Sequence, residues 1–175
     1  MIRIPLRWVI YEDLDIKGTD EDLQIMTYAC ENVLNQNINL IGLDFADIVD
    51  AFEGTTICAG MGSANGPDSQ EKAFKAALDS LASKCDTNKM ETFLICVLSV
   101  NCESSLVKKT SRFAAAVKQT ANENAYLMIG AACPDNLKDQ IEVIIIATDK
   151  HPDDHVKPDD KDIKLVELPA FLTTI

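Results

Sequence analysis

The sequence predicts an α+β fold: a four-stranded mixed β-sheet with packed helices, preceded by a long helix. Apolar stretches of strand length alternate with segments in which apolar residues recur at helical spacing. The last two strand-like stretches are separated only by a short, turn-rich link, which indicates an antiparallel pair at the end of the sheet. With 175 residues, of which 47% are apolar and 25% charged, the chain is long enough for one domain with a substantial core.

The first part of the chain predicts one extended segment and one helix. Residues 2–11, IRIPLRWVIY, are rich in β-branched and aromatic residues, and Pro5 favours an edge position for this segment. From residue 20 to residue 35, apolar residues recur at helical spacing, and acidic residues occupy the first turn, where they suit the helix dipole. The expected buried stripe of this helix comprises Leu23, Met26, Cys30, Val33 and Leu34.

The middle of the chain predicts a helix, a strand and a second helix. Residues 42–52, GLDFADIVDAF, favour a short helix, and residues 54–62, GTTICAGMG, favour a strand. The loop SANGP then leads into a helix that begins at Asp68, because Asp68 and Glu71 have the spacing of a capping pair. The expected buried stripe of that helix comprises Phe74, Ala77, Leu78 and Leu81.

The last elements are three strands and one long helix. A strand at residues 92–100 precedes a helix at residues 104–119, and two strands follow at residues 126–133 and 141–148. The link PDNLKDQ, residues 134–140, is short and rich in turn-forming residues, so we expect the last two strands to be antiparallel neighbours. The expected buried face of the helix comprises Leu106, Thr110, Phe113, Ala114 and Val117.

Composition divides the chain into four expected segments. An N-terminal extension at residues 1–18 precedes a domain at residues 19–149. Residues 150–163 form a charged linker, KHPDDHVKPDDKD and one further residue, which buries too little apolar surface to offset its ordering entropy and is therefore expected to be flexible. Residues 164–175 end in an apolar tip, an arrangement typical of a short recognition peptide on a tether.

The charge balance and the cysteine pattern exclude several classes of function. Asp and Glu outnumber Lys and Arg by 28 to 16, and the formal charge of −12 repels phosphate backbones, so nucleic acid is not an expected partner. The six cysteines include no CxxC pair, which indicates a reducing compartment rather than a disulfide framework or a zinc site. No apolar run is long enough to span a membrane, and no signal-peptide core is found, so we expect a cytoplasmic protein without direct membrane insertion.

Two carboxylates, Asp44 and Asp47, lie three residues apart in GLDFADI, residues 42–48. The simpler interpretation is local: Asp44 caps the short helix, and Asp47 lies in its first turn near the positive end of the helix dipole. The functional interpretation is a carboxylate pair that polarises a water molecule, which requires an electrophile at a second site. The residues of this chain alone reveal no such second site and favour the local interpretation.

Two other motifs are better explained by structure than by chemistry. GMGSANG, residues 60–66, lacks the lysine of a phosphate-binding GxxxxGK[ST] loop and is expected to be a tight turn that leads into a capped helix. His151 and His155 have the chemistry to hold a metal ion together with Asp153 and Asp154. Their charged surroundings favour a solvated linker instead.

Taken in order, these motifs resemble the C-terminal half of FtsZ, the tubulin-like family of bacterial cell division. The family pattern N-[LV]-D-F-A-D-[VI] follows a central helix, and here GLDFADI follows the predicted helix. The family's next motif, GxxxMGxGxxxGxDR followed by an alanine-rich helix, is similar to GTTICAGMGSANGPDSQEKAFKAAL. The family then has a strand, a helix and two further strands, which are similar in that order to FLICVLSVN, SSLVKKTSRFAAAVKQ, AYLMIGAAC and IEVIIIATD. LPAFL is similar to the family's recognition peptide, [IL]-P-A-[FY]-L. The resemblance covers residues 20–172.

The resemblance implies a fold like the C-terminal domain of tubulin and FtsZ, preceded by the family's central helix. In the family, the acidic loop of one subunit meets the GTP bound by the next, so Asp44 and Asp47 would polarise the attacking water in trans. Two departures from the family matter. The family's GGGTG-type GTP-binding loop is not found in the residues before the helix, and Gly42 replaces the asparagine that precedes the acidic pair.

The resemblance therefore implies a cell-division polymer component or regulator, at the division site, without a cofactor of its own and without GTPase activity alone. The expected partners are an FtsZ-type GTPase subunit or a separately encoded GTPase domain, which carries the GTP, and a membrane-tethering division protein. The alternatives are a stand-alone α+β small-molecule-binding domain or enzyme, and a truncated product without a role. The residues expected to bind the tethering protein are Leu168, Pro169, Ala170, Phe171 and Leu172.

Overall fold

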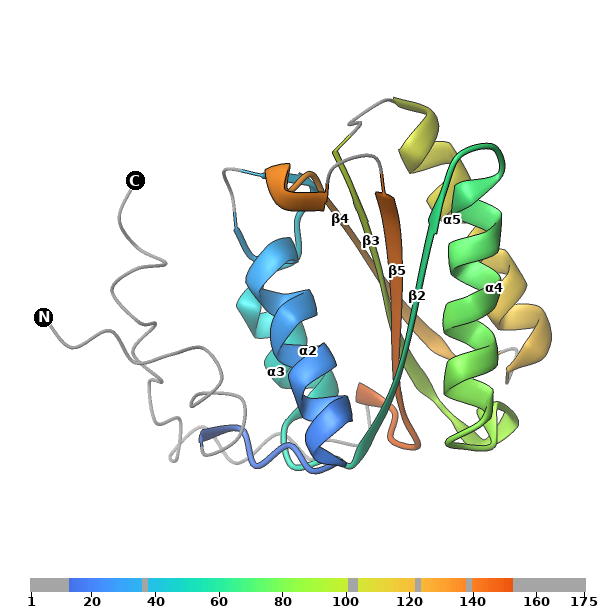
Figure 1. The fold of residues 1–175 in the computed structure, drawn as a ribbon. Coiled ribbons are helices and arrows are strands. Elements are labelled where there is room, and N and C mark those ends of the chain that lie inside the picture. Colours follow the sequence, from blue (N-terminus) through green and yellow to red (C-terminus); the bar gives the residue numbers. More distant parts are fainter. Residues whose placement is uncertain (1–12, 36–37, 101–103, 122–123, 138–139, 153–175) are drawn as a thin grey trace, which may run out of the picture.

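The computed structural model describes residues 13–35, 38–100, 104–121, 124–137 and 140–152. Within them, a five-stranded β-sheet lies between two layers of helices (Figure 1). Helices α2 and α3 cover one face of the sheet, and α4 and α5 cover the other. The segment predicted as extended at residues 2–11 lies outside the described residues.

The sheet is mixed, as the sequence predicts, but it has a fifth strand. Its order is β1-β4-β3-β5-β2. β3 and β4 are parallel, and the other three pairs are antiparallel. The additional strand, β1, has only three residues and pairs with the end of β4, so it is too short for an alternating pattern to reveal. The strands are β1 (Asn39–Ile41), β2 (Ile57–Asn65), β3 (Thr92–Ser99), β4 (Tyr126–Ala132) and β5 (Gln140–Thr148).

The predicted pairing of the last two strands is wrong. β3 lies between β4 and β5, parallel to the first and antiparallel to the second. Every residue of β3 is buried, and a continuously apolar strand is stabilised in the middle of a sheet, where both its edges and both its faces are covered. The connection from β4 to β5, which includes the 3-10 helix Asp135–Leu137, therefore spans the width of one strand.

Four helices correspond to the four predicted ones. They are α2 (Asp20–Val33), α3 (Phe45–Phe52), α4 (Ser69–Ala82) and α5 (Ser104–Thr120). The expected stripe of α2 is buried in full, which confirms the pattern of that helix. In α4 the buried residues include Ala77 and Leu81, whereas Phe74 and Leu78 are only partly buried, and the Phe74 ring stacks on Phe113 of α5 at a centroid distance of 4.4 Å.

The start of α4 differs from the prediction. Asp68 has left-handed backbone angles, φ 59° and ψ 23°, and its side chain makes no capping hydrogen bond, so the predicted Asp68–Glu71 capping pair is wrong. The preceding strand also continues through Asn65, so the glycine-rich stretch is mostly strand, and the turn itself is at Gly66, where φ is +75°.

Two glycines of that stretch allow α4 to pack closely on β2. A Cβ atom at Gly60 would lie 2.3 Å from the Ala77 carbonyl oxygen, and one at Gly62 would lie 2.2 Å from the Ala73 carbonyl oxygen. No real Cβ contact is that short, so any side chain at either position would push helix and strand apart. These glycines serve helix packing rather than a phosphate loop.

Two side chains bond the outer edge of β2, the last strand of the sheet, at Ala59. The Asp22 carboxylate is 3% exposed and accepts the Ala59 N–H at 2.9 Å, while Lys84 Nζ donates to the Ala59 carbonyl at 2.9 Å and to Asp22 at 3.1 Å. Burial alone would raise the pKa of Asp22, but its hydrogen bonds from Thr19, Ala59 and Lys84 outweigh burial and hold the pKa below the ordinary value. These bonds occupy the outward backbone groups of Ala59, so another strand cannot pair with β2 at this residue.

The cysteines differ in part from the prediction. Cys30 and Cys96 are buried free thiols, and burial raises the pKa of Cys30 to about 12. Cys58 and Cys85 are free thiols of intermediate exposure. Cys133, by contrast, is disulfide-bonded, so the expectation of free thiols throughout is wrong for this residue.

Candidate functional site

The acidic loop, residues 42–48, connects β1 to α3 and includes the first turn of α3. It lies on the side of the sheet that α2 also covers. Gly130 of β4 has no side chain, so Val33 and Leu43 approach it closely: a Cβ there would be 2.7 Å from Val33 and 3.4 Å from Leu43. Leu43 is thereby packed beneath the loop. At Gly42, where the resemblance leads one to expect asparagine, a Cβ would lie 2.4 Å from the Asn39 side-chain nitrogen. The Asn39 amide thus occupies the space beside Gly42.

Asp44 and Asp47 together form the start of α3. Asp44 is the N-cap, and its Oδ1 accepts the Ala46 N–H at 3.1 Å. Asp47 is three residues further on and accepts the Asp44 N–H on its Oδ2 at 3.2 Å, which completes a reciprocal capping box. The local interpretation of these two residues is therefore correct as a description of this chain's own structure.

The same helix separates an apolar face from an acidic face. Phe45, Ile48, Ala51 and Phe52 are buried in the core, whereas the acidic residues at positions 44, 47 and 50 are all exposed. Three-residue spacing places these three residues next to one another along one side of the helix, although the directions of their carboxylates differ. Among the described residues, none of the three has a salt-bridge partner at 4.0 Å or less. Within the described part of the chain, the acidic face therefore carries no ion-pair partner of its own.

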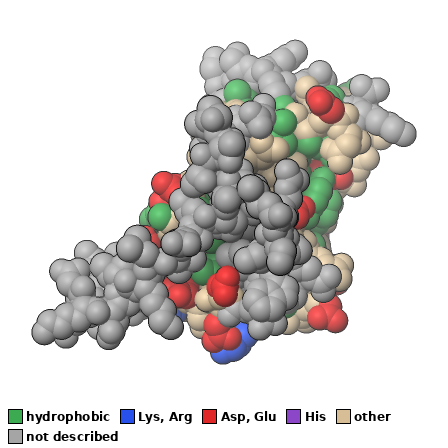
Figure 2. Space-filling model, turned by 90° about the vertical axis from the view of Figure 1, so that its left-hand side faces the viewer, with side chains coloured by type: hydrophobic (Ala, Val, Ile, Leu, Met, Phe, Trp, Pro, Cys, Tyr) green, Lys and Arg blue, Asp and Glu red, His purple; other side chains and the backbone are tan. Residues whose placement is uncertain are grey.

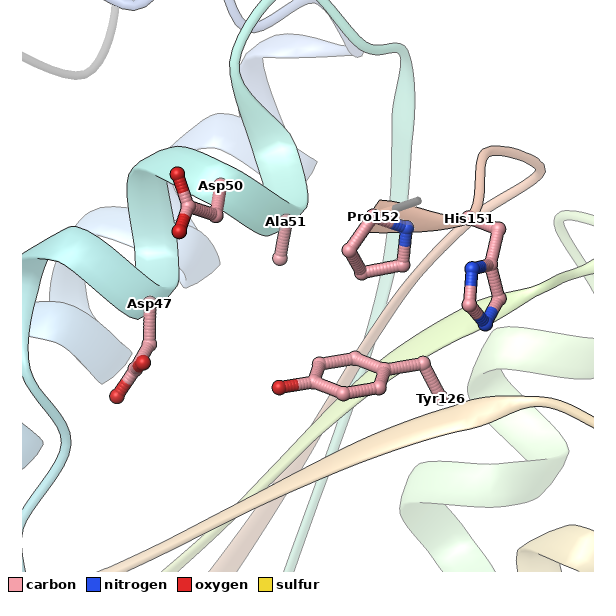
Figure 3. Close-up of a pocket in the computed structure, with 6 residues that line it drawn as sticks. All are labelled: Asp47, Asp50, Ala51, Tyr126, His151 and Pro152. Carbon is pink, nitrogen blue, oxygen red and sulfur yellow. The ribbon is translucent and has the colours of Figure 1, made fainter. Parts of the chain in front are cut away.

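A shallow pocket of about 210 Å³ opens beside this acidic face. Figure 3 shows Asp47, Asp50 and Ala51 of α3 on one side, and Tyr126 with His151 on the other. The Tyr126 ring is 41% exposed, its hydroxyl points toward α3, and the His151 ring meets it edge to face at a centroid distance of 6.1 Å. The pocket thus combines carboxylates with an exposed phenol.

The pocket does not have the geometry of a metal centre. Figure 3 shows the Asp47 and Asp50 carboxylates projecting from α3 in different directions. Within the described part of the chain, no group of three or more His, Cys, Asp or Glu side chains is arranged to hold a metal ion. His151 contacts Tyr126 instead, and His155, its predicted companion, lies outside the described residues.

The geometry allows each carboxylate of the loop a different role. Asp44 accepts two backbone N–H groups, from Ala46 and Asp47, so its charge stabilises the helix start. Asp47 holds one backbone N–H with Oδ2, and its Oδ1 accepts no hydrogen bond from the described residues. Asp47 therefore has the freer acceptor for a water molecule or a partner's donor group.

On the side of the molecule shown in Figure 2, acidic side chains outnumber basic ones among the described residues. In the space-filling view of this side, Asp and Glu atoms are spread over the coloured surface, and Lys and Arg atoms gather at its lower edge (Figure 2). This distribution agrees with the formal charge of −12 and favours a partner surface that is basic or carries a bound cation.

Two site residues were missed by the sequence analysis. Asp50 extends the spacing of Asp44 and Asp47 by three more residues, and that repeat was a usable signal. Tyr126 was assigned only to a strand, and nothing local distinguishes it, because the pocket forms from segments far apart in the chain. The five predicted peptide-binding residues, Leu168 to Leu172, lie outside the described residues. No described helix has the length and apolarity needed to cross a membrane.

Comparison with known proteins places these features in a family. The model of the FtsZ family, C-terminal domain, matches residues 55–151, which is more than half of the chain. That match includes β2 to β5 and the helices between them, and begins just after the acidic loop and α3. No curated protein sequence shows a significant match.

Solved structures of two kinds of protein share the fold. An empty FtsZ dimer from M. jannaschii is similar with a TM-score of 0.60 at 22% identity, over 72% of this chain and 37% of that one. A tryptophan-to-tyrosine mutant of the same FtsZ matches equally well, at 0.60 and 22%, over 72% of this chain and 38% of that one. GDP-form protofilaments of TubZ from Bacillus thuringiensis serovar israelensis match at 0.56 and 11% identity, over 74% of this chain and 34% of that one. The chain thus spans less than two-fifths of the FtsZ and TubZ chains it resembles.

Proposed function

This chain belongs to the FtsZ family, whose C-terminal domain it contains, and from that premise we propose that it takes part in a cell-division polymer as a component or regulator. In the proposed role, it presents its acidic loop in trans to the GTP of a neighbouring FtsZ-type subunit. In this proposal, the neighbouring subunit carries the GTP. The observation that carries the proposal is the exposed acidic face at the start of α3, in which Asp47 Oδ1 is unoccupied within the described residues.

Asp47 is the residue proposed to act on the water. Its exposed carboxylate sits at the edge of an open pocket, and a second molecule can approach it without displacing the core residues beneath α3. A carboxylate in that position orients a water molecule toward a phosphoryl group, which is a contribution to positioning rather than to nucleotide affinity.

Asp44 is proposed to support Asp47 rather than to replace it. Because Asp44 fixes the first turn through the Ala46 N–H, it sets the direction in which Asp47 leaves the helix. Gly42 carries no amide of its own, and we infer that the neighbouring Asn39 side chain supplies the polar group at this position. With that polar group in place, we expect the chain to stimulate the GTPase activity of a partner subunit. If the chain only ends a filament, we expect it to suppress filament growth instead.

The test mixes the full chain with an FtsZ-type GTPase and measures phosphate release and sedimentation of polymer. We expect either faster phosphate release or shorter filaments, and no turnover from the chain alone. Asp47→Ala is expected to abolish stimulation. Glu71→Gln serves as the matched control. Glu71 is an exposed residue of α4 on the other face of the sheet, so the change removes one charge without touching the acidic loop.

Two outcomes separate the versions of this proposal. If the wild-type chain shortens filaments but Asp47→Ala does so equally, the chain acts as a cap and the acidic loop has no part in hydrolysis. If polymer mass, filament length and phosphate release all stay unchanged at excess chain, the proposed polymer role is wrong.

The terminal peptide is proposed as a separate docking element for a membrane-tethering division protein. Phe171 and Leu172 follow a charged linker, and burying each in a partner groove contributes about 1.5 to 3 kcal/mol before the peptide's ordering cost is subtracted. Pro169 restricts the unbound peptide and reduces that cost.

Titration calorimetry with a synthetic peptide of residues 164–175 tests the docking role against a candidate tethering protein. We expect binding by the wild-type peptide and much weaker binding by the same peptide with Phe171→Ala. Equal affinity of the two peptides, or no binding by either, would remove the docking role and leave the polymer proposal untouched.

A further inference from the structure

A pair of free thiols lies on the other side of the sheet from the acidic loop, at the end of α4. Cys58 belongs to β2, and Cys85 follows the last turn of α4. Both side chains pack against the same cluster of core residues, the one between the sheet and α4. Both residues have intermediate exposure, in contrast to the fully buried Cys30 and Cys96.

Sheet geometry explains why two cysteines so far apart in sequence meet. Side chains alternate along β2, and Gly60 and Gly62 both face α4, so Cys58 faces α4 as well. A Cβ at Gly60 would lie 2.6 Å from the Leu81 backbone nitrogen, which puts Cys58 just beyond the end of the helix. The chain turns back there, because the Cys85 N–H donates to the Leu81 carbonyl at 3.1 Å.

The two thiols are neighbours, and the surroundings of Cys85 keep its thiol protonated. Cys85 Sγ donates its proton to the Leu81 carbonyl oxygen at 3.7 Å, and the Cys58 thiol is close enough to act on its pKa. Burial first, and then the neighbouring Cys58, raise the pKa of Cys85 to about 12. Cys85 therefore stays a thiol near neutral pH and is a poor first nucleophile.

We propose that Cys58 and Cys85 form a reversible disulfide by exchange with a small-molecule disulfide such as oxidised glutathione. The Cys58 thiolate attacks one sulfur of that disulfide, breaks its S–S bond and releases one thiol, leaving a mixed disulfide on Cys58. Cys85 then loses its proton to solvent and attacks the Cys58 sulfur, which releases the second thiol. The protein loses two electrons and two protons overall, and the small disulfide gains them as two thiols.

The disulfide would fasten the edge strand to the end of α4. Lys84, next to Cys85, already bonds the Ala59 carbonyl next to Cys58, at 2.9 Å, so the two segments are held together before oxidation. The covalent link restricts the unfolded chain between residues 58 and 85. We expect the midpoint of thermal unfolding to rise by about 5 to 10 °C on oxidation and to fall back after reduction.

Peptide mapping of the full chain tests this inference. The folded chain is incubated with oxidised glutathione, quenched with acid and an alkylating agent, digested with trypsin and examined by mass spectrometry. We expect a Cys58-containing peptide joined to a Cys85-containing peptide. Cys30→Ser is expected to leave that linkage and the rise in melting temperature unchanged, whereas Cys85→Ser is expected to stop at a glutathione adduct on Cys58 and to show no rise.

Two results would overturn the inference. One is a folded wild-type chain in which Cys58 and Cys85 both remain open to alkylation, or carry separate glutathione adducts, after the oxidant has reacted. The other is linkage of either cysteine to Cys133 rather than to its neighbour. Circular dichroism of the serine variants confirms that each is folded, so that a missing linkage reports on chemistry rather than on unfolding.

Discussion

The two helices on one face of the sheet begin with the same local motif, yet their acidic residues lie in opposite surroundings. Thr19 with Asp22, and Asp44 with Asp47, each form a capping box across three residues. Asp22 is 3% exposed and is bonded both to β2 and to the segment after α4, whereas Asp47 is exposed and holds only its own cap residue among the described residues. The motif determines where a helix begins. Tertiary partners determine whether its carboxylate is structural or free to act on another molecule.

The largest expected effect comes from removing the buried carboxylate. Asp22→Ala leaves the Ala59 N–H without its acceptor and Lys84, whose side chain is only 23% exposed, without its closest anion. We expect a loss of about 2 to 4 kcal/mol in the free energy of unfolding, measured by urea denaturation. Glu21→Gln is the matched control, because Glu21 also pairs with Lys84, at 3.3 Å, but is 70% exposed, and we expect a change below about 0.5 kcal/mol. Equal effects of the two variants would show that burial does not separate them.

The contribution of Asp22 is expected to depend on pH. Because its pKa is lowered in the folded state, its stabilisation is present above the unfolded pKa of about 3.9 and is lost as the pH falls through the lower folded value. The difference in unfolding free energy between wild type and Asp22→Asn should therefore shrink in acid. Urea titrations between about pH 7 and about pH 2 measure it. A difference that stays constant over that range would contradict an ionised, bonded Asp22.

The next effect comes from the cation that faces Asp22. Burial would lower the pKa of Lys84, but Asp22 and Glu21 outweigh it and raise the pKa. Lys84→Met keeps most of the apolar stem and removes the donor to the Ala59 carbonyl, so we expect a loss of about 1 to 2 kcal/mol. Combined with Asp22→Asn, it should show a coupling energy of at least about 0.5 kcal/mol, since the two side chains lie 3.1 Å apart. Strict additivity in the double-mutant cycle would show that each residue acts on β2 independently.

A smaller effect is expected at the cap of α3. Asp44→Ala removes the acceptor for the Ala46 N–H at the exposed start of α3. We expect a loss of about 1 kcal/mol in the free energy of unfolding. Asp44→Ser keeps a capping oxygen, so we expect it to lose only roughly a few tenths of a kcal/mol. Thermal melts of the two variants measure the difference. If both lose the same amount, the charge of Asp44, and not its capping bond, stabilises the helix.

The comparison also shows what the sequence can predict. The four helices, the buried stripe of α2 and the long strands follow from local spacing, and the acidic loop follows from a motif of seven residues, whereas the predicted Asp68–Glu71 cap of α4 is wrong. The pairing of β4 and β5 was wrong because it was inferred from the length of the link alone, while the position of β3 between them depends on burial of β3 along its whole length.

Long-range contacts are the part that spacing cannot reveal. The bond from Ala59 to Asp22 joins residues 37 positions apart, and the bond from Lys84 to Asp22 joins residues 62 apart. In each bond, the sequence around one partner contains no local pattern that predicts the other partner. Tyr126 is likewise placed near α3 by the sheet, so the pocket beside Asp47 is a property of the fold rather than of any motif.

The smallest effect on stability is expected at Asp47, and it sharpens the comparison most. Asp47 accepts one exposed N–H, from Asp44 at 3.2 Å, and is bonded to no distant segment among the described residues, so Asp47→Ala should lose less than about 0.5 kcal/mol in urea denaturation. Asp22 in the equivalent position of its own box should lose several times more, because its second set of partners lies in β2 and beyond α4. If Asp47→Ala destabilised the chain as strongly as Asp22→Ala, its carboxylate would be structural. It would then not be free for the neighbouring subunit to which we assign it.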